Sequence, residues 1–298
     1  MSLTAAYTDP VSSIGRIFVA GAGLMGHGIA QVHAAIGAEV HLYEPDLARA
    51  KAGLDRIAGN LDRSVAKGRL SAGDRDATLA RITSTDALDL VAGADLVMEA
   101  VFEDLAVKRA LWRELDGRAA THAIFASNTS SIAIATLAEV VSPARRERFI
   151  GMHFFSPVPV MPLIEIIRAD ATSEATVAAI RSLAADLGKS VIVSADRPGF
   201  IVNRILMPFL ADAMRIYEQG VGTAEDIDVG ARIGLNHPMG PLELADFIGL
   251  DVCLGIMRVL DADLGLAHLR PPAVLEELVA AGHLGQKTGR GFYTYPRD

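Results

Sequence analysis

The chain has 298 residues, of which 51% are hydrophobic, and a net charge of −8. That apolar fraction suffices for the core of one large or two ordinary domains, and the acidic balance argues against a broad nucleic-acid interface. No stretch has the roughly 20 uninterrupted apolar residues of a membrane span, and no basic segment with an apolar run opens the chain. We expect a globular cytoplasmic protein without a membrane or nucleic-acid partner, in which residues 1–13 are a disordered lead-in.

Cysteine and histidine placement gives no sign of a metal. The single cysteine, Cys253, cannot form a disulfide within the chain, and beside Leu254 it is expected to be a small buried apolar residue, as suits a reducing cytosol. The eight histidines form no cluster with metal-ligand spacing, and His27 and His33 fall on different faces of one predicted helix. We therefore expect no structural metal.

A glycine-rich turn follows the first apolar run. Residues 17–20 are typical of a buried strand, and apolar residues with helical spacing begin near residue 29. Between them stands the pattern G-x-G-x-x-G, formed by Gly21, Gly23 and Gly26. Gly21 allows a tight turn, Gly23 lets the backbone approach a pyrophosphate, and Gly26 allows close helix–strand packing. An incidental glycine turn is the alternative.

Glu44 favours the nucleotide interpretation. It ends the next strand, predicted over residues 40–43, and lies 18 residues beyond Gly26. A carboxylate at that place binds the adenosine ribose hydroxyls of NAD and repels the 2′-phosphate of NADP. We predict an NAD site, with NADP the less favoured cofactor because a loop can supply a compensating basic residue.

The chain continues as alternating strands and helices. Strands are predicted over residues 95–98, ending at Glu99, and over residues 123–126, with a helix over residues 105–119 between them. This alternation predicts a doubly wound, mostly parallel sheet of the Rossmann type, which binds ligands beyond the carboxyl ends of its strands. Asn128 and Ser130 follow such an end, so they are expected to face the cofactor; the alternative is an N-cap of the next helix, and the two roles can coexist.

An insertion separates Glu44 from the strand near residue 82. It is predicted as a helical hairpin, with helices over residues 47–66 and 71–80. A solvated helix face explains its basic residues; the alternative is a patch for the phosphates of a large anionic substrate. The basic residues are Arg49, Lys51, Arg56, Arg63, Lys67 and Arg69.

His153 and Glu165 are ionisable residues in an otherwise apolar segment. If Glu165 lies in a strand buried on both faces, its carboxylate needs a partner, and His153 is the nearest candidate. A carboxylate that orients an imidazole makes it a better general base. The alternative is that His153 caps a strand and Glu165 faces solvent. A bend that brings the two together is favoured by the prolines between them, Pro157, Pro159 and Pro162.

The last third of the chain is predicted to be helical. A final strand over residues 190–193 precedes a turn, so we place domains at residues 1–196 and 197–298. The second domain is large enough to close a substrate cleft and bury a subunit interface. Asn203 lies early in its first helix, where its amide can donate to a substrate carbonyl or bridge backbone groups. The predicted helices are residues 200–219, a segment after the N-cap Thr223, 242–260 and 272–281.

Together these segments resemble the L-3-hydroxyacyl-CoA dehydrogenase family, above all its short single-function members, the 3-hydroxybutyryl-CoA dehydrogenases. The resemblance covers nearly the whole chain from about residue 17. It is carried by GAGLMGHGIAQ, residues 127–131, GMHFFSPVPVMPLIE, and residues 198–204, 238–241 and 287–293. It implies a Rossmann-type domain with a helical hairpin insertion, an all-α C-terminal domain, and reversible NAD-dependent oxidation of a (3S)-3-hydroxyacyl-CoA.

The resemblance also implies roles for individual residues. His153 would be the catalytic base and Glu165 its partner, while Ser130 and Asn203 would contact the acyl-CoA substrate. Arg63 and Lys67 would help to hold coenzyme A, and the C-terminal helices would form a homodimer. Ser156 stands where many members have Asn, and His27 where small residues are common. The residues implied to bind the cofactor are Gly21, Gly23, Leu24, Met25, Gly26, Glu44, Glu103, Lys108, Ser130 and Ser156.

Two rival functions remain at this point. One is a dehydrogenase of the same fold that acts on a free hydroxy acid such as a sugar acid; the other is a non-catalytic NAD-binding or structural protein. The HFFSP segment and the basic hairpin favour the CoA thioester, with 3-hydroxybutyryl-CoA as the expected substrate. The sequence fixes neither the acyl chain length nor the metabolic pathway.

Overall fold

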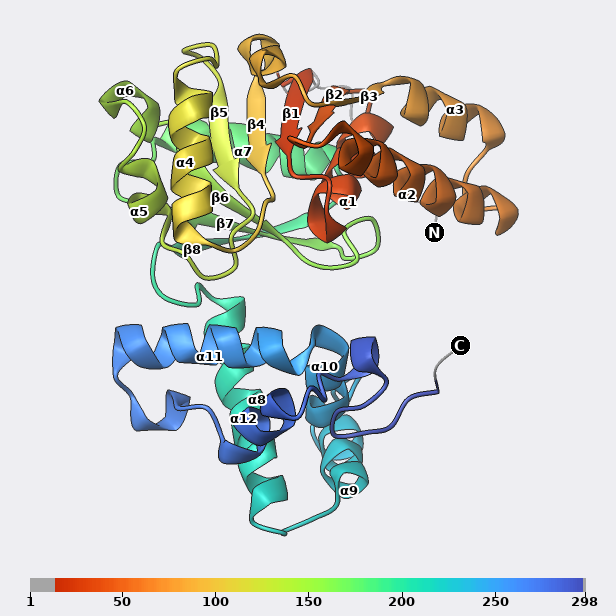
Figure 1. Cartoon of the computed structure of the whole chain (residues 1–298), viewed down its shortest axis with the longest axis vertical. Helices are drawn as coiled ribbons and strands as arrows, with labels where there is room; N and C mark the ends of the chain where they lie inside the picture. Colours follow the sequence, from red (N-terminus) through yellow and green to blue (C-terminus); the bar gives the residue numbers. More distant parts are fainter. Residues whose placement is uncertain (1–13, 297–298) are drawn as a thin grey trace, which may run out of the picture. The chain divides into compact units, whose positions relative to one another are not determined.

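The computed structural model describes residues 14–296, which form two compact units that divide between Asp196 and Arg197. The predicted lead-in, residues 1–13, lies outside the described residues. The described part of the first unit contains an eight-stranded sheet of order β3-β2-β1-β4-β5-β6-β7-β8 (Figure 1). Its strands are β1 Arg16–Ala20, β2 Glu39–Tyr43, β3 Ile82–Thr85, β4 Leu96–Glu99, β5 Ile124–Ser127, β6 Phe149–Phe154, β7 Leu163–Arg168 and β8 Ser190–Ala195.

Strand pairing confirms the predicted doubly wound, mostly parallel sheet. Within the described sheet, β6 and β7 form the one antiparallel pair, and every other neighbouring pair is parallel. The order reverses between β1 and β4, where α/β sheets of this kind bind their ligands. The carboxyl ends of β1, β2, β4 and β5 therefore meet at one edge of the sheet.

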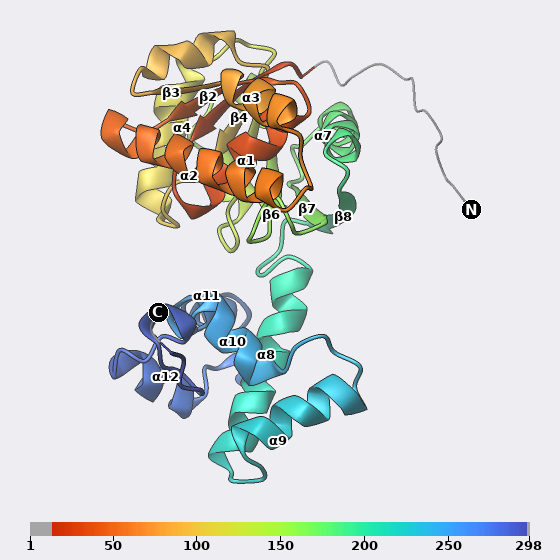
Figure 2. The same ribbon diagram turned by 90° about the vertical axis from the view of Figure 1, so that its right-hand side faces the viewer.

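Helices cover both faces of this sheet, with α4 and α7 on opposite sides (Figure 2). On one face, strand residues such as Val19 and Ile166 form a single core with α1 and α7. On the other, Trp112 of α4 stacks on Phe125 with ring centroids 4.9 Å apart. The helices of this unit are α1 Leu24–Ala35, α2 Leu47–Ala66, α3 Ala72–Ala80, η1 Leu88–Gly93, α4 Leu105–Asp116, α5 Ile134–Ala138, α6 Pro143–Arg146 and α7 Glu174–Asp186.

The helical hairpin insertion is present: α2 has the predicted bounds, and α3 begins at Ala72, one residue later than predicted, because Ser71 is its N-cap. The Asp46 carboxylate accepts a hydrogen bond from the backbone N–H of Ala48 at the start of α2. The Ser71 hydroxyl accepts one from the N–H of Asp74 in α3. Such caps satisfy N–H groups that have no partner inside the helix. The predicted helix over residues 105–119 ends earlier, at Asp116, with Gly117 at its C-cap.

The described part of the second unit is helical, as predicted. Thr223 is the N-cap of α9, where its hydroxyl accepts a hydrogen bond from the N–H of Asp226. The single helix predicted over residues 242–260 is wrong, because Gly249 has φ +105° and divides it into α10 and α11. The elements are α8 Val202–Glu218, α9 Ala224–Val229, η2 Gly230–Gly234, α10 Pro241–Ile248, α11 Leu250–Leu264, η3 Ala267–Leu269, α12 Ala273–Ala280 and η4 Gln286–Thr288.

Two buried aspartates attach the C-terminal segment to this helical unit. The Asp246 carboxylate accepts hydrogen bonds from the backbone N–H groups of Phe292 and Tyr293, both at 3.0 Å. Asp228 accepts one from the Tyr293 hydroxyl at 2.8 Å. Burial raises the pKa of Asp246 above its ordinary value, against the opposing effect of those N–H donors. The motif that ends the chain is therefore part of the packed unit.

His33 is a buried histidine of α1 whose fully enclosed ring lies in the sheet core. Its Nδ1 lies 2.8 Å from the carbonyl oxygen of Ile29. Burial lowers its pKa from 6.5 to about 4, which the hydrogen bond to Ile29 only partly offsets. The folded protein therefore holds this imidazole neutral under conditions in which the unfolded chain protonates it.

We expect His33 to make folding sensitive to acid. Between pH 6.5 and about 4 the unfolded chain binds one more proton at His33 than the folded protein, so stability falls as the pH falls. The contribution of His33 to this loss is up to about 3 kcal/mol. Urea unfolding of the wild type and of His33→Leu from pH 7 to pH 4 measures it. A variant whose stability falls as steeply as that of the wild type would contradict the assignment.

Candidate active site

The glycine turn between β1 and α1 has one glycine with open space beside it. A Cβ added at Gly26 would lie 1.7 Å from the Gly21 carbonyl oxygen, and one added at Gly21 would lie 2.5 Å from the carbonyl oxygen of Ala100. A Cβ at Gly23 would meet nothing within 4 Å. Gly23 is the N-cap of α1 and caps it with no side chain, and Leu24 beside it is 72% exposed. Close packing of the backbone explains why positions 21 and 26 are glycines. At Gly23, by contrast, the space beside the N-terminus of α1 is open, so an anion could approach the positive end of the helix dipole.

Glu44 lies where the cofactor prediction requires a carboxylate. It follows β2, is buried, and its Oε1 accepts a hydrogen bond from the backbone N–H of Ala22 at 2.9 Å. This bond holds the carboxylate against the glycine turn. The residues of the turn and Glu44 thus fit the phosphate and ribose ends of a dinucleotide, although the ribose contact itself stays a prediction.

His153 and Glu165 lie directly opposite each other on β6 and β7. His153 Nδ1 is 3.1 Å from Glu165 Oε2. Glu165 is fully buried and His153 is 7% exposed. The alternative in which Glu165 faces solvent at a strand edge is therefore wrong, because β7 lies inside the sheet between β6 and β8. The Phe155 ring packs on the imidazole with centroids 4.5 Å apart.

The loop between β6 and β7 is anchored on two sides. Lys189 Nζ donates to the carbonyl oxygens of Val158 at 2.8 Å and Met161 at 2.7 Å. Val158 is buried against Gly28 of α1: a Cβ added at Gly28 would lie 2.9 Å from the Cβ of Val158. Burial lowers the pKa of the Lys189 ammonium. The Lys189 ammonium thus fixes the loop that joins His153 to Glu165. Ser156 lies exposed in this loop.

Asn128 ties β5 to β6 and is not a helix cap. Its Oδ1 accepts a hydrogen bond from the backbone N–H of Phe154 at 2.8 Å, immediately after His153. The N-cap of α5 is Ala133, which provides no side-chain acceptor. The first two N–H groups of α5 donate instead to the Asp196 carboxylate, at 2.9 and 2.7 Å. Asn128 therefore helps to fix the end of β6 that carries His153.

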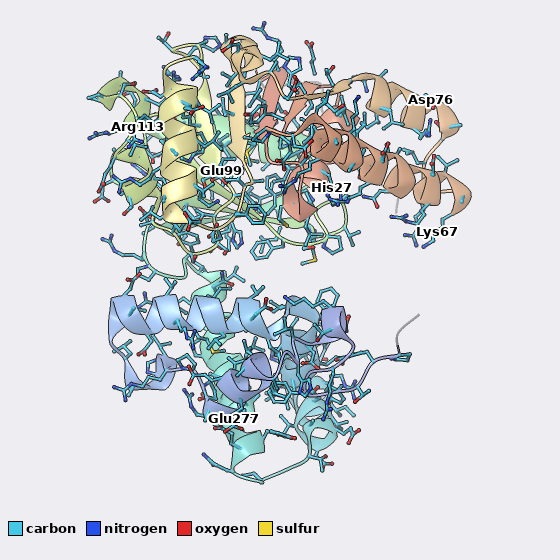
Figure 3. All side chains as sticks on the ribbon, in the orientation of Figure 1. His27, Lys67, Asp76, Glu99, Arg113 and Glu277 are labelled. Carbon is cyan, nitrogen blue, oxygen red and sulfur yellow. The ribbon has the colours of Figure 1, made fainter. Side chains whose placement is uncertain are left out.

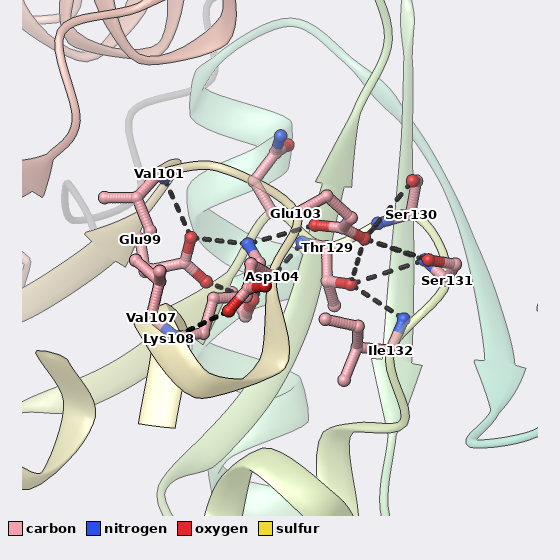
Figure 4. A network of polar contacts seen from close by, with 12 residues as sticks. Glu99, Val101, Glu103, Asp104, Val107, Lys108, Thr129, Ser130, Ser131 and Ile132 are labelled. Atoms are coloured by element: carbon pink, nitrogen blue, oxygen red, sulfur yellow. Dashed lines mark hydrogen bonds and ion pairs between the residues drawn. The ribbon is translucent and has the colours of Figure 1, made fainter. Parts of the chain in front are cut away.

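The structure brings Ser130, Glu103 and Lys108 together (Figure 4). Glu103 Oε1 accepts from the Ser130 N–H at 2.8 Å, and Lys108 Nζ lies 3.1 Å from Glu103 Oε2. Burial acts to raise the pKa of Glu103, but the Lys108 charge and the hydrogen bonds from the Thr129 side chain and Ser130 outweigh it, so the pKa lies below its ordinary value. Glu103 is thus a carboxylate at neutral pH.

Glu99 belongs to the same group of side chains, although the sequence did not mark it as functional. Its carboxylate is fully buried, 2.6 Å from Lys108 Nζ. Like Glu44, it stands at the carboxyl end of a buried apolar strand. An acidic residue at such a strand end was part of the signal that pointed to Glu44, and it would have marked Glu99 as well.

The residues predicted to hold coenzyme A come from several elements, and two of them, Arg63 and Lys67, are neighbours at the end of α2, where the Lys67 N–H donates to the Arg63 carbonyl oxygen at 3.2 Å. Arg63 lines a hollow of about 450 Å³ along α1 and α2, together with His27, Asp55, Arg56, Gly59 and Asn60. Lys67 is exposed at the outer end of the hairpin, away from His27 and Glu99 (Figure 3). Asn203 is buried near the start of α8 in the other unit. Its contribution to the His153 site stays a prediction.

No three His, Cys, Asp or Glu side chains within residues 14–296 are grouped as they would be around a metal ion. None of the helices described there is both long and apolar enough to span a bilayer.

Family models match both units of the chain. The model of the 3-hydroxyacyl-CoA dehydrogenase NAD-binding domain matches residues 16–197, and that of the C-terminal domain of the same enzymes matches residues 199–295. The chain belongs to the 3-hydroxyacyl-CoA dehydrogenase family. The resemblance inferred from the motifs is confirmed, and so is the presence of an NAD-binding domain.

Individual relatives are similar over almost the full chain. The 3-hydroxybutyryl-CoA dehydrogenase of Bradyrhizobium diazoefficiens is 48% identical over 95% of this chain and 96% of its own. The human mitochondrial hydroxyacyl-coenzyme A dehydrogenase is 43% identical over 99% of this chain and 95% of its own. The crystal structure of (S)-3-hydroxybutyryl-CoA dehydrogenase from Ralstonia eutropha has a TM-score of 0.92 and 44% identity, covering 96% of this chain and 100% of its own.

We expect Gly23→Ala to weaken NADH binding without weakening the fold. The added methyl meets no protein atom within 4 Å, but it occupies the side from which a pyrophosphate would approach. The dissociation constant for NADH should rise about tenfold or more, equivalent to roughly 1.4 kcal/mol. Fluorescence titration and thermal unfolding measure the two effects. Gly255→Ala, at an equally open position in α11, is the control. Unchanged affinity in Gly23→Ala would contradict the assignment.

Proposed function

We propose that this protein catalyses the reversible, NAD-dependent oxidation of a (3S)-3-hydroxyacyl-CoA, with 3-hydroxybutyryl-CoA as the favoured substrate, to the 3-oxoacyl-CoA. The observation that carries the proposal is the buried His153–Glu165 pair in a chain of this family. The activity named for close relatives supports the choice of substrate.

His153 acts as the general base. An alcohol is too weak an acid to ionise at neutral pH, so its proton must leave as the hydride leaves C3. Glu165 engages Nδ1 and thereby directs Nε2 to the substrate hydroxyl. Its buried carboxylate also stabilises the imidazolium that forms. NAD, when bound, supplies the hydride acceptor.

The remaining residues bind and orient the reactants. The N–H groups at the start of α1 receive the pyrophosphate, and Glu44 receives the ribose, which favours NAD over NADP. Ser130 and Asn203 contact the acyl group. The hollow beside Arg63 holds part of coenzyme A, with Lys67 as a further cation of the same hairpin.

The helical unit provides a homodimer interface. It carries exposed apolar side chains that would otherwise remain in contact with water, and surfaces of this kind mark subunit contacts. Ile205 is 68% exposed, Ile233 79% and Leu235 64%. Light scattering on the purified chain measures its mass in solution.

A reducing compartment suits the one thiol. Cys253 is buried, and burial raises its pKa to about 12, so it is a poor nucleophile and an inert part of the core. We propose that the enzyme is cytoplasmic because its single cysteine can form no disulfide within the chain, and cell fractionation tests that placement.

His153→Gln should lose at least about a hundredfold in turnover while it still binds NADH, because general-base assistance is worth about 10²–10⁴-fold. The assay follows NADH absorbance with acetoacetyl-CoA, and NADH binding is titrated separately. Near-normal turnover would remove His153 from the mechanism.

Glu165→Gln separates the partner from the base. The amide keeps the shape of the side chain but cannot stabilise an imidazolium, so turnover should fall while thermal unfolding stays close to that of the wild type. Unaltered turnover would show that Glu165 plays no part.

The wild-type assay decides the reaction class. Acetoacetyl-CoA with NADH should react rapidly, whereas NADPH or a free 3-oxo acid should react slowly. Preference for the free acid would support the dehydrogenase of free hydroxy acids instead. Binding of NADH without turnover of either substrate would support a non-catalytic role.

A further inference from the structure

Lys108 is a fully enclosed cation between two carboxylates. Its side chain is 1% exposed, and its Nζ lies 2.6 Å from Glu99 Oε1 and 3.1 Å from Glu103 Oε2. Removal of an ammonium from water costs several kcal/mol, which close pairing must offset. Lys108 therefore has little surface left to offer a ligand.

Glu99 holds Lys108 without reaching any ligand itself. Its side chain has no exposed surface, and both of its oxygens are engaged. Oε1 also accepts the backbone N–H of Val101 at 2.9 Å, and Oε2 accepts the Ser127 hydroxyl at 2.6 Å. Glu99 thus links the end of β4 to the end of β5, and its carboxylate also fixes the Lys108 ammonium.

Glu103 connects Lys108 to the turn that follows β5. While Oε2 faces Lys108, Oε1 accepts hydrogen bonds from that turn, among them those from the Thr129 hydroxyl at 2.6 Å, the Ser130 N–H at 2.8 Å and the Ser131 N–H at 3.1 Å (Figure 4). The Ser130 and Ser131 hydroxyls lie 3.3 and 3.1 Å from the same oxygen. One carboxylate oxygen therefore organises the whole turn, and Lys108 determines where that carboxylate lies.

We propose that Glu99 and Lys108 are positioning residues: Glu99 fixes Lys108, Lys108 fixes the Glu103 carboxylate, and Glu103 holds the turn that presents Ser130. The inference rests on the proposed function, in which Ser130 contacts the substrate, and deepens it. It assigns Lys108 an indirect role through Glu103, beside the place near the cofactor that the family resemblance implies. The competing explanation is that the three charges only stabilise the fold.

A charge-neutral double variant separates the two explanations. Lys108→Met alone leaves Glu99 buried and unpaired, so it should unfold at a lower temperature than the wild type. Adding Glu99→Gln removes both charges and should restore most of the lost thermal stability. Positioning predicts that this stable double variant still turns over acetoacetyl-CoA at least tenfold more slowly, because Glu103 has lost its cation. Recovery of turnover to within twofold of the wild type would overturn the proposal.

A Ser130→Ala background tests the route of the effect. If the charges act through Ser130, the double change should cost much less activity in Ser130→Ala than in the wild type. If they act only on the fold, the two losses should multiply, and the proposal fails. Arg109→Met/Glu139→Gln is the matched control, since it removes a partly exposed ion pair of 2.9 Å from the same helix. It should leave turnover unchanged.

Hydrogen–deuterium exchange gives a readout that needs no substrate. The amides of residues 129–131 should exchange faster in the double variant than in the wild type, and equal rates would overturn the proposal. If the wild type does not turn over acetoacetyl-CoA, the proposed function fails while this measurement still decides the positioning. If the double variant does not fold, Ser127→Ala takes its place, since it keeps every charge and removes the hydrogen bond from the Ser127 hydroxyl to Glu99. Because the same hydroxyl accepts the Thr129 N–H, only the amides of Ser130 and Ser131 are compared in this variant. Their exchange should be faster than in the wild type, and unchanged exchange would count against the proposal.

Discussion

The register between β6 and β7 is the constraint on which the site depends. Side chains alternate along a strand, so a slip of one residue would turn Glu165 to the opposite face of the sheet from His153. Gly151 helps to fix this register because it pairs with Ile167, and a Cβ there would lie 2.7 Å from the Ile167 Cβ. A larger residue at this position would push the strands apart two residues before His153. The geometry of an acid–base pair therefore depends on a residue that has no side chain.

Buried carboxylates hold the edge of the sheet in a second way. Glu44 binds the glycine turn through a backbone N–H, and Glu99 binds the ends of two strands and one cation. Each negative charge leaves water, and each accepts at least one hydrogen bond from a segment distant in sequence: Glu44 from Ala22 and Glu99 from Ser127. The loops that would surround a ligand are thereby held before any ligand arrives, which reduces the ordering cost of binding.

Most strands and the helical hairpin could be predicted because apolar runs, glycines and capping residues are local signals. The pairing of His153 with Glu165 was also accessible, since a charged residue inside an apolar run demands a partner. Gly249 was missed as a break because its positive φ depends on packing that the 242–260 periodicity does not contain. The contacts of Lys189 and Lys108 could not be predicted either, because carbonyl oxygens and carboxylates from separate loops meet only after folding.

The attachment of the C-terminal segment also affects how damaged copies of the chain would fare in a cell. Residues 292 and 293 supply the N–H groups that Asp246 accepts, and Tyr293 supplies the hydroxyl bound by Asp228. A chain shortened by premature termination before these residues would lose three hydrogen bonds to carboxylates, each worth about 1.5–3 kcal/mol. Such a loss is comparable to the whole stability of a typical domain. Truncated chains would therefore be largely unfolded and degraded by cellular proteases, so their effect would be a low amount of enzyme and not a slow enzyme.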